Sequence, residues 1–143
     1  MLGPFRVLAA LRTALLADTA LVALVGDRVA VAYPWGITDA VFPCVTIWQE
    51  ADQQAVSLPR TNDPARVRVD ALSQRNAAEA AEIYERVFLV LHKREQTLGL
   101  VGQVVIKECR QVWNMFPVWD ARLQVWMAPT RFLIRAMIPG TSL

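Results

Sequence analysis

The sequence predicts an α+β fold, with a mainly antiparallel sheet of four to five strands and helices packed on one face of that sheet. Three observations lead to this prediction. Apolar residues recur at helical spacing near the N-terminus and after residue 76. Segments that alternate apolar and polar residues gather in 27–73 and after residue 100, without regular alternation of strand and helix. The length of 143 residues suits one domain, which we expect to span 1–143.

The N-terminal region predicts two short helices that meet at a corner. Residues 5–16 carry an apolar stripe, and Asp18 is placed to cap a second helix by accepting a backbone N–H bond. Gly26 is placed to end that helix in a left-handed conformation. The uncharged run Thr19–Gly26 is far shorter than the roughly 20 apolar residues of a membrane span. Charges also interrupt the apolar core of any signal peptide, so we expect no membrane segment and no secretion.

The composition is rich in apolar residues, at 55%, and the net charge is only +2. Without a membrane span, surplus apolar side chains most often belong to subunit interfaces. The small net charge gives no indication of nucleic-acid binding. All basic residues except Lys93 and Lys107 are arginines, which either a GC-rich genome or the preference for Arg at interfaces explains. Two cysteines make no disulfide framework, so we expect a reduced, intracellular origin.

Three strand segments are predicted before the central helix. A short strand lies within 27–34, and Pro43 opens a second strand, CVTIWQEA. The third, ARVRVDALS at 65–73, has the clearest alternation in the chain, which predicts a half-buried strand. Its side chains divide between a core face with Val67, Val69 and Ala71, and a solvated or interface face with Arg66, Arg68 and Asp70.

The strongest helix signal begins at Asn76, because NAAE resembles a capping box with Glu79 three residues further on. Glu82 and Arg86 are spaced to pair on the solvated face of this helix. Three more strands are predicted within 102–113, 120–127 and 131–138, with Pro129 between the last two. The apolar stripe of the helix comprises Ala77, Ala80, Ala81, Tyr84, Val87, Phe88 and Leu91.

The motifs of common catalytic and metal sites are absent from the sequence. There is no phosphate-binding loop, no HExxH and no CxxC, and one histidine does not build a usual metal site. We therefore expect no catalytic residues, no cofactor and no metal. One alternative stays open: His92 activating Cys44 or Cys109, as in a small hydrolase, or a ligand-binding domain that uses these residues.

Two segments are candidates for partner contacts. The stretch VWNMFPVWDARLQVW is rich in aromatic residues, which indicates core packing of a hairpin, an anchor for a protein partner or a nucleic-acid platform. A nucleic-acid platform needs interleaved basic residues, and only Arg110 and Arg122 are near. The anchor candidates are Trp113, Met115, Phe116, Trp119 and Trp126. Residues 52–64 read as a long mobile loop that contacts a partner through Asp52, Gln53, Gln54, Leu58, Arg60, Asn62 and Asp63.

Four segments together resemble the tail terminator, or tail-completion, proteins of long-tailed phages and gene-transfer agents. The first is ALRTALLADTALVALVGDRV, with two helices joined at LLAD and a Gly-Asp-Arg step into the first strand. The others are the Pro-led strand FPCVTIWQE, the strand-turn-helix ARVRVDALSQRNAAEAAEIYERVFLVL and the closing strand RFLIRAMI. The aromatic-rich stretch 113–128 departs from the family pattern, because it is longer and more apolar.

The resemblance implies a structural virion subunit with no enzymatic activity. Such proteins form a ring, usually a hexamer, at the head-proximal end of the tail tube. The ring ends tube polymerisation and joins the tail to the head. The implied partners are identical subunits, the major tail tube protein and a head-completion or stopper protein. DNA passes through the lumen without tight binding. A different neck component, such as a stopper, is the main alternative.

A conduit for DNA needs few free cations in its wall, because each phosphate that is neutralised adds affinity. We therefore expect Arg66, Arg68, Arg131 and Arg135 to be held by carboxylates or by subunit contacts. Asp70, on the same face of the strand as Arg68, is a candidate partner.

Overall fold

A computed structural model gives the fold and describes residues 3–37, 40–50, 65–94, 100–101 and 104–137. The helices are α1 (Gly3–Leu16), α2 (Thr19–Val25) and α3 (Ala77–Leu91), with a 3-10 turn η1 at Pro34–Gly36. The strands are β1 (Val29–Val31), β2 (Cys44–Gln49), β3 (Ala65–Ser73), β4 (Leu100–Val101), β5 (Val104–Asn114), β6 (Val118–Asp120) and β7 (Val125–Met137). The fold is therefore α+β, as the sequence predicts.

The strands form one sheet in the order β1-β2-β3-β7-β5-β4, and β6 also pairs with β7. Every pairing is antiparallel except that of β1 with β2, which is parallel. The described part of the chain has a seven-stranded sheet, where four to five strands were expected. The strands beyond that number are β4 and β6, which have only two and three residues.

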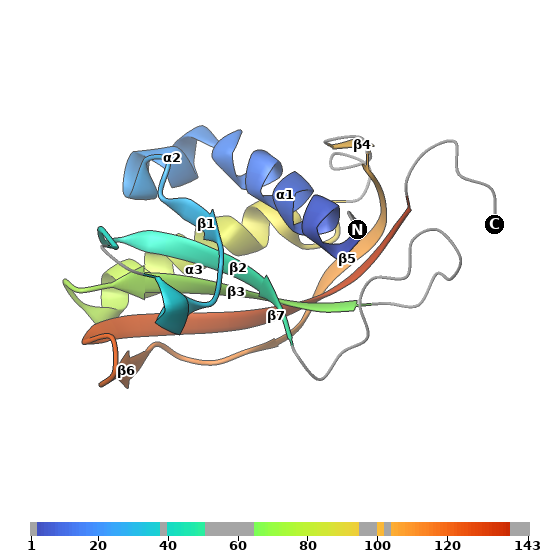
Figure 1. The fold of residues 1–143 in the computed structure, drawn as a ribbon. Coiled ribbons are helices and arrows are strands. Elements are labelled where there is room, and N and C mark those ends of the chain that lie inside the picture. Colours follow the sequence, from blue (N-terminus) through green and yellow to red (C-terminus); the bar gives the residue numbers. More distant parts are fainter. Residues whose placement is uncertain (1–2, 38–39, 51–64, 95–99, 102–103, 138–143) are drawn as a thin grey trace.

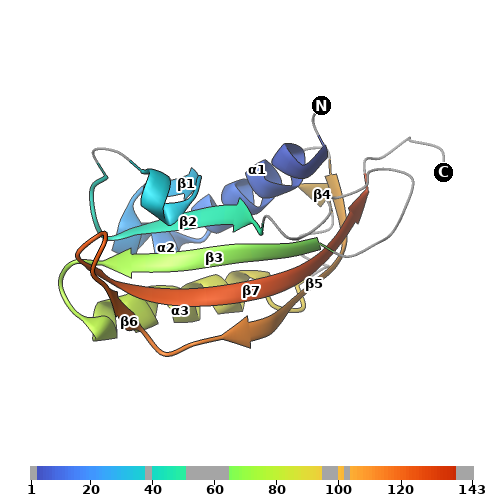
Figure 2. The same cartoon turned by 60° about the horizontal axis from the view of Figure 1, so that its bottom comes forward.

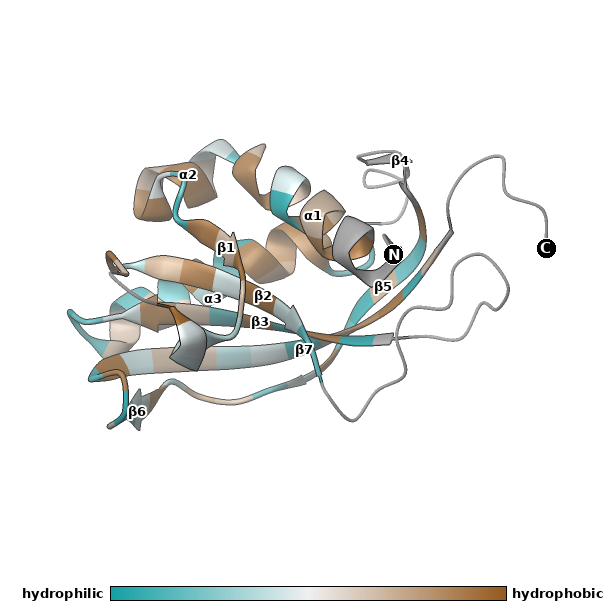
Figure 3. Ribbon diagram, in the orientation of Figure 1, coloured by the Kyte–Doolittle hydropathy of each residue, from teal (hydrophilic) through white to brown (hydrophobic). Residues whose placement is uncertain are grey.

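The three α-helices pack on one face of the sheet, and none of them covers the other face, where the η1 segment contacts Trp48 (Figures 1 and 2). Hydrophobic residues concentrate between the helices and the sheet (Figure 3). Leu11 and Leu15 of α1, Ile83 of α3 and Phe132 of β7 have no exposed surface there. Ile83 was missing from the predicted stripe of α3, although Ala80, Val87 and Leu91 were in it and are buried.

Asp18 forms the corner between α1 and α2 and connects it to α3. Its carboxylate accepts a hydrogen bond from the Leu21 backbone N–H at 2.9 Å, which makes it the predicted cap of α2. The same carboxylate binds the Arg86 guanidinium at 2.9–3.2 Å. Arg86 therefore pairs with Asp18 across the helical layer, where a pair with Glu82 was expected. Gly26 ends α2 with a φ of +62°, as predicted.

No single helix among the described residues is both long enough and apolar enough to cross a membrane. Residues Val7–Leu16 and Thr19–Val25 meet that criterion of length and composition only as a pair, and they are bent by 91° relative to each other.

The start of α3 follows the predicted cap with one change. The Asn76 side chain accepts a hydrogen bond from the Glu79 backbone N–H at 2.7 Å, as expected. The Glu79 side chain accepts a hydrogen bond from the Ser73 hydroxyl at 2.7 Å, and Ser73 in turn accepts from the Arg75 backbone N–H. In a full capping box, the Glu79 side chain would accept from the Asn76 backbone N–H. Here it accepts from Ser73, the last residue of β3, and this bond fixes α3 to the sheet.

Pro129 lies inside β7, so the prediction that it separates two strands was wrong. Its carbonyl accepts a hydrogen bond from the Met115 backbone N–H. Because N and O of one strand residue point the same way, the missing N–H of Pro129 also faces residues 115–117. These residues form the break between β5 and β6, so no ladder bond is lost.

The prediction of a continuous strand over 120–127 was also wrong, because residues 121–124 form a turn. Asp120 nucleates this turn: its side chain accepts from the Leu123 backbone N–H and its carbonyl accepts from that of Gln124. Gln124 adopts a φ of +59°. A local side-chain bond therefore outcompetes the strand that the alternating pattern indicated.

Substitutions of Asp18 separate the two roles of its carboxylate. Asp18→Ala removes the cap of α2, and we expect a loss of about 1 kcal/mol in the free energy of unfolding. Asp18→Asn keeps a capping oxygen and loses only the charge that binds Arg86, so its loss is smaller. Urea unfolding of the three proteins measures both losses.

The pH dependence gives a second readout. The hydrogen bond from Arg86 is the largest cause that lowers the pKa of Asp18. A folded pKa below the unfolded value stabilises the protein above the ordinary Asp pKa, and this contribution disappears as the pH falls through the folded value. The difference between wild type and Asp18→Asn should therefore shrink as the pH falls below the ordinary Asp pKa and vanish below the folded pKa of Asp18. A difference that persists there would contradict this assignment.

Candidate interaction surface

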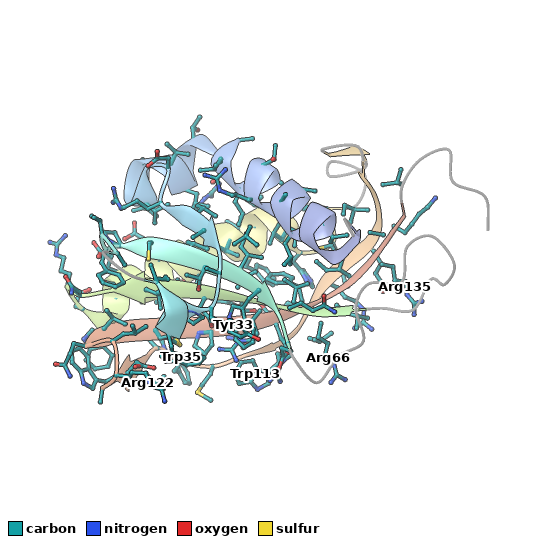
Figure 4. The ribbon with its side chains drawn as sticks, in the orientation of Figure 1. Tyr33, Trp35, Arg66, Trp113, Arg122 and Arg135 are labelled. Atoms are coloured by element: carbon teal, nitrogen blue, oxygen red, sulfur yellow. The ribbon has the colours of Figure 1, made fainter. Side chains whose placement is uncertain are left out.

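The sheet face that no helix covers carries charged and aromatic side chains, which we call the open face. The register places them on one side, because Arg68 pairs with Trp48 on β2 and with Arg131 on β7. Figure 4 shows Arg66, Trp113 and Arg135 on the side of the sheet opposite the helices. The open face comprises Trp48, Glu50, Arg66, Arg68, Asp70, Glu108, Arg110, Trp113, Arg131 and Arg135.

Asp70 lies at the centre of the open face, and its side chain has no exposed surface. Its carboxylate accepts a hydrogen bond from Arg68 at 2.7 Å and another from the Trp48 indole N–H at 2.8 Å. Burial raises the pKa of Asp70, and the Arg68 charge and these hydrogen bonds oppose the rise. The predicted Arg68–Asp70 pair is therefore present.

Arginines and tryptophans alternate across the strands. The Arg68 guanidinium lies 5.1 Å from the ring centroid of Trp48 and 5.7 Å from that of Trp113. The Arg131 guanidinium lies 4.7 Å from the ring centroid of Trp113 and pairs with Glu50. Stacking on indole rings and pairing with carboxylates fix both guanidinium groups in orientation. Glu50 and Trp48 were not predicted as site residues, although the alternation of residues 44–49 indicates which of them share a face.

A second charged group surrounds Glu108 on β5. Its carboxylate binds Arg135 at 2.8 Å and Arg110 at 3.0 Å. Both hydrogen bonds lower the pKa of Glu108, and the bond from Arg135 has the larger effect. The predicted pairing with carboxylates is thus present for Arg68, Arg131 and Arg135. Arg66 is exposed and forms no ion pair with another described residue.

The aromatic-rich stretch does not form one cluster, because the structure divides it among three environments. Trp113 joins the open face, whereas Trp126 packs against the main core and contacts Trp119 edge to face at 5.5 Å. Phe116 projects into solvent with 89% of its surface exposed. The remaining apolar residues at this edge form what we call the edge patch, Met115, Phe116, Val118 and Trp119, each at least 40% exposed.

An aromatic group from η1, absent from the sequence predictions, extends the open face. Tyr33 contacts Trp48 with ring centroids 4.7 Å apart. The Trp35 indole N–H donates to Asp120 at 2.8 Å, and Arg122 lies 5.8 Å from the Trp35 ring (Figure 4). The local signal in the sequence is YPWG, in which two aromatic side chains flank a proline.

The described residues contain no group of three or more His, Cys, Asp or Glu side chains that could hold a metal ion. Cys44 and Cys109 are both buried, and burial raises the pKa of Cys44 to about 11. His92 accepts a hydrogen bond from the Gln111 backbone N–H at its Nδ1 atom, and its ring stacks on Phe88. These positions suit structural roles better than thiol catalysis, because a protonated thiol is a weak nucleophile. The predicted contact loop at 52–64 lies outside the described residues.

The Arg68–Asp70 pair predicts a large effect of Arg68→Ala on stability. Removing the cation leaves a carboxylate without exposed surface, and we expect a loss of roughly 3–5 kcal/mol in the free energy of unfolding. Arg66→Ala on the same strand is the matched control and should change stability by less than about 0.5 kcal/mol, because Arg66 is exposed. Urea unfolding at neutral pH compares them.

The stability that Arg68→Ala loses relative to wild type should become smaller as the pH falls. The unpaired Asp70 has a pKa above that of the unfolded chain, so the folded state binds the proton more tightly and gains stability at lower pH. Equal stabilities of Arg68→Ala and Arg66→Ala at neutral pH would mean that Asp70 does not depend on this pair.

Comparison with known proteins agrees with the fold and identifies the family. No curated protein matches the chain. A chain from a solved structure described as the virion of a native gene transfer agent (GTA) particle has the same fold, with a TM-score of 0.65 and 18% identity. The match covers 90% of this chain and 92% of that one. Residues 9–114 match the family described as tail completion protein gp17. The chain therefore belongs to the tail completion protein gp17 family, and its place is in the virion.

Proposed function

We propose that this chain forms a closed ring at the head-proximal end of the tail tube, where it ends tube polymerisation and joins the tail to the head. Membership of a tail completion family supports a structural role at this position. The observation that carries the proposal is the edge patch, in which Phe116 exposes 89% of its surface. A large exposed aromatic side chain at a sheet edge is typical of a contact surface between proteins.

A ring accounts for the edge patch better than one isolated contact does, because every subunit then buries its patch. Met and aromatic side chains are enriched at the centres of interfaces, where their burial contributes most of the binding energy. A patch that pairs with the same patch of a second copy gives a closed dimer, so in a ring of more than two subunits its partner surface lies elsewhere on the chain. Such head-to-tail contacts either close into a ring or continue as a fibre. The number of subunits that we propose, six, rests on the resemblance to tail terminators.

The open face contributes specificity to the assembly. Arg68 and Arg131 are held by carboxylates and indole rings, so they lose little conformational freedom when a partner binds. Paired charges at an interface mainly select the correct partner, since desolvation offsets much of their attraction. We assign this face to contacts with a neighbouring subunit, the tail tube protein or a head-completion protein.

The proposed lumen conducts DNA without gripping it. On the open face, Arg68, Arg131 and Arg135 are bound to carboxylates, and the net charge of the chain is only +2. A paired arginine neutralises a phosphate less well than a free one, because its carboxylate competes for the cation. The ring therefore presents few free cations to DNA.

The ring predicts a single large species in solution. Native mass spectrometry of the purified protein should give a closed oligomer, alone or after mixing with tail tubes. Extracts from a phage that lacks its tail completion protein should yield tails of normal length only when this protein is added. A strictly monomeric protein that also fails to complete tails would exclude the proposal. A ring that joins heads without limiting tail length would instead favour a stopper or another neck component.

The same extracts test the proposed tail-tube contact of residues 52–64. A variant with a shortened 52–64 segment should keep its melting temperature and its oligomeric mass, yet complete fewer tails. Normal tail completion by this variant would remove the segment from the contact surface.

Weak DNA binding is a further expectation. Duplex DNA should bind with an apparent Kd above about 10 μM at physiological salt, which is within the range of non-specific contacts. Arg66→Ala should leave this affinity nearly unchanged, because one phosphate contact contributes little. Fluorescence anisotropy at several salt concentrations measures both. Tight, steeply salt-dependent binding that Arg66→Ala weakens would indicate a nucleic-acid-binding module.

A further inference from the structure

We propose that Phe116 of one subunit inserts into an apolar pocket beside β1 of the next subunit, a contact that rests on the proposed ring and specifies how its subunits join. The pocket has a volume of about 240 Å³. Its apolar lining comes from Val29 and Ala30 of β1, from Ile37 and Val41 of the following segment, and from Cys44.

The pocket fits a phenyl ring in size and chemistry. An engineered apolar cavity of about 150 Å³ in another protein binds benzene, so about 240 Å³ accommodates the ring of a phenylalanine. Asp27 and Arg28 form the polar part of the wall, and Arg28 is held there because its Nε donates to the Pro43 carbonyl at 2.8 Å. Val41 at the rim is 63% exposed and extends the apolar surface around the mouth.

Phe116 has the exposure that an inserted side chain requires. It lies between β5 and β6, and 89% of its surface is exposed. Met115 and Val118, at 45% and 40% exposure, surround it and would contact the rim of the pocket. Pro117 follows directly, which limits the backbone freedom of the segment and lowers the entropy lost on insertion.

In the structure the chain does not fill its own pocket with Phe116, because that side chain is 89% exposed. The pocket borders β1, the first strand in the sheet order, whereas Phe116 follows β5, which is four strand positions away. At about 4.8 Å per position, strands β1 and β5 lie roughly 19 Å apart across the sheet. Opposite edges of one sheet thus carry a projecting ring and a pocket, and repeated insertion in one direction gives a head-to-tail assembly.

Cys44 in the pocket permits a direct test with one substitution. Phe116→Cys places a thiol at the pocket of the next subunit. High protein concentration offsets the contact that is lost with the phenyl ring, and alkaline pH offsets the raised pKa of Cys44. Under these conditions, oxidation with copper phenanthroline should give covalent dimers, trimers and larger products on a non-reducing gel. Phe116→Cys combined with Cys44→Ala should give none. Leu89→Cys on α3, of comparable 46% exposure to the edge patch, is the matched control and should not form this ladder. Covalent dimers without larger products would indicate reciprocal pairing and overturn the head-to-tail contact.

Two further variants measure the energetic importance of the contact. Phe116→Ala should weaken assembly by about thirtyfold per contact, as expected for an interface hot spot. Ala40→Phe, which fills the pocket from within, should weaken assembly similarly. Phe116→Ala should also leave the melting temperature of the monomer nearly unchanged, since the Phe116 side chain is exposed.

The outcomes separate this contact from the proposed function. If wild type forms rings and completes tails while Phe116→Ala does the same and Phe116→Cys gives no ladder, the contact is wrong and the ring stands. If wild type is monomeric and completes no tails, the proposed function fails. The proposed Phe116 contact then also fails, unless Phe116→Cys still forms a disulfide with Cys44 in a concentrated solution.

Discussion

The carboxylate of Asp70 has no exposed surface, yet it lies on the sheet face that no described helix covers. A buried charge is tolerated only when its hydrogen-bonding capacity is met, so this position requires Arg68 and the Trp48 indole as neighbours. The Arg68 guanidinium in turn lies over the rings of Trp48 and Trp113, which fix its orientation. The arrangement of the open face thus follows from one carboxylate on the central strand β3.

Features that depend on neighbours in the chain could be predicted from the sequence. Asp18, Gly26 and Asn76 act within one helical turn, and each forms the predicted terminus. Features that depend on distant strands could not. Pro129 is accepted inside β7 only because β5 ends where it does, and Arg86 reaches Asp18 only because α2 and α3 pack together. Neither condition is visible in a local pattern.

The same distinction explains the candidate surface. The alternation in β3 predicted that Arg66, Arg68 and Asp70 share a face, since a strand has a period of two. The aromatic-rich stretch was predicted as one set, but the turn at Asp120 gives its members different faces. Trp126 therefore contributes to the core, whereas Phe116 is left exposed at the sheet edge. Tyr33 and Trp35 were missed because they precede their partners by many residues.

The covered face, the open face and the edges of the sheet contribute differently to the fold and to the proposed assembly. The helices bury one face of the sheet and supply the main apolar core, so much of the second face is free to carry charge. At one end of that second face, a smaller apolar cluster is formed by Cys44, Leu72, Val125 and Met127. Most charges on that face are paired within the chain, with Arg66 as the exposed exception, and this pairing limits non-specific association. The apolar groups with the greatest exposure lie instead toward the two edges of the sheet, at Phe116 and at Val41. Subunits placed side by side contact one another through the edges of their sheets, whereas subunits placed face to face stack in layers. A sheet with one covered face, one face whose charges are mostly paired and exposed apolar groups toward its edges therefore supports the proposed ring over a layered dimer.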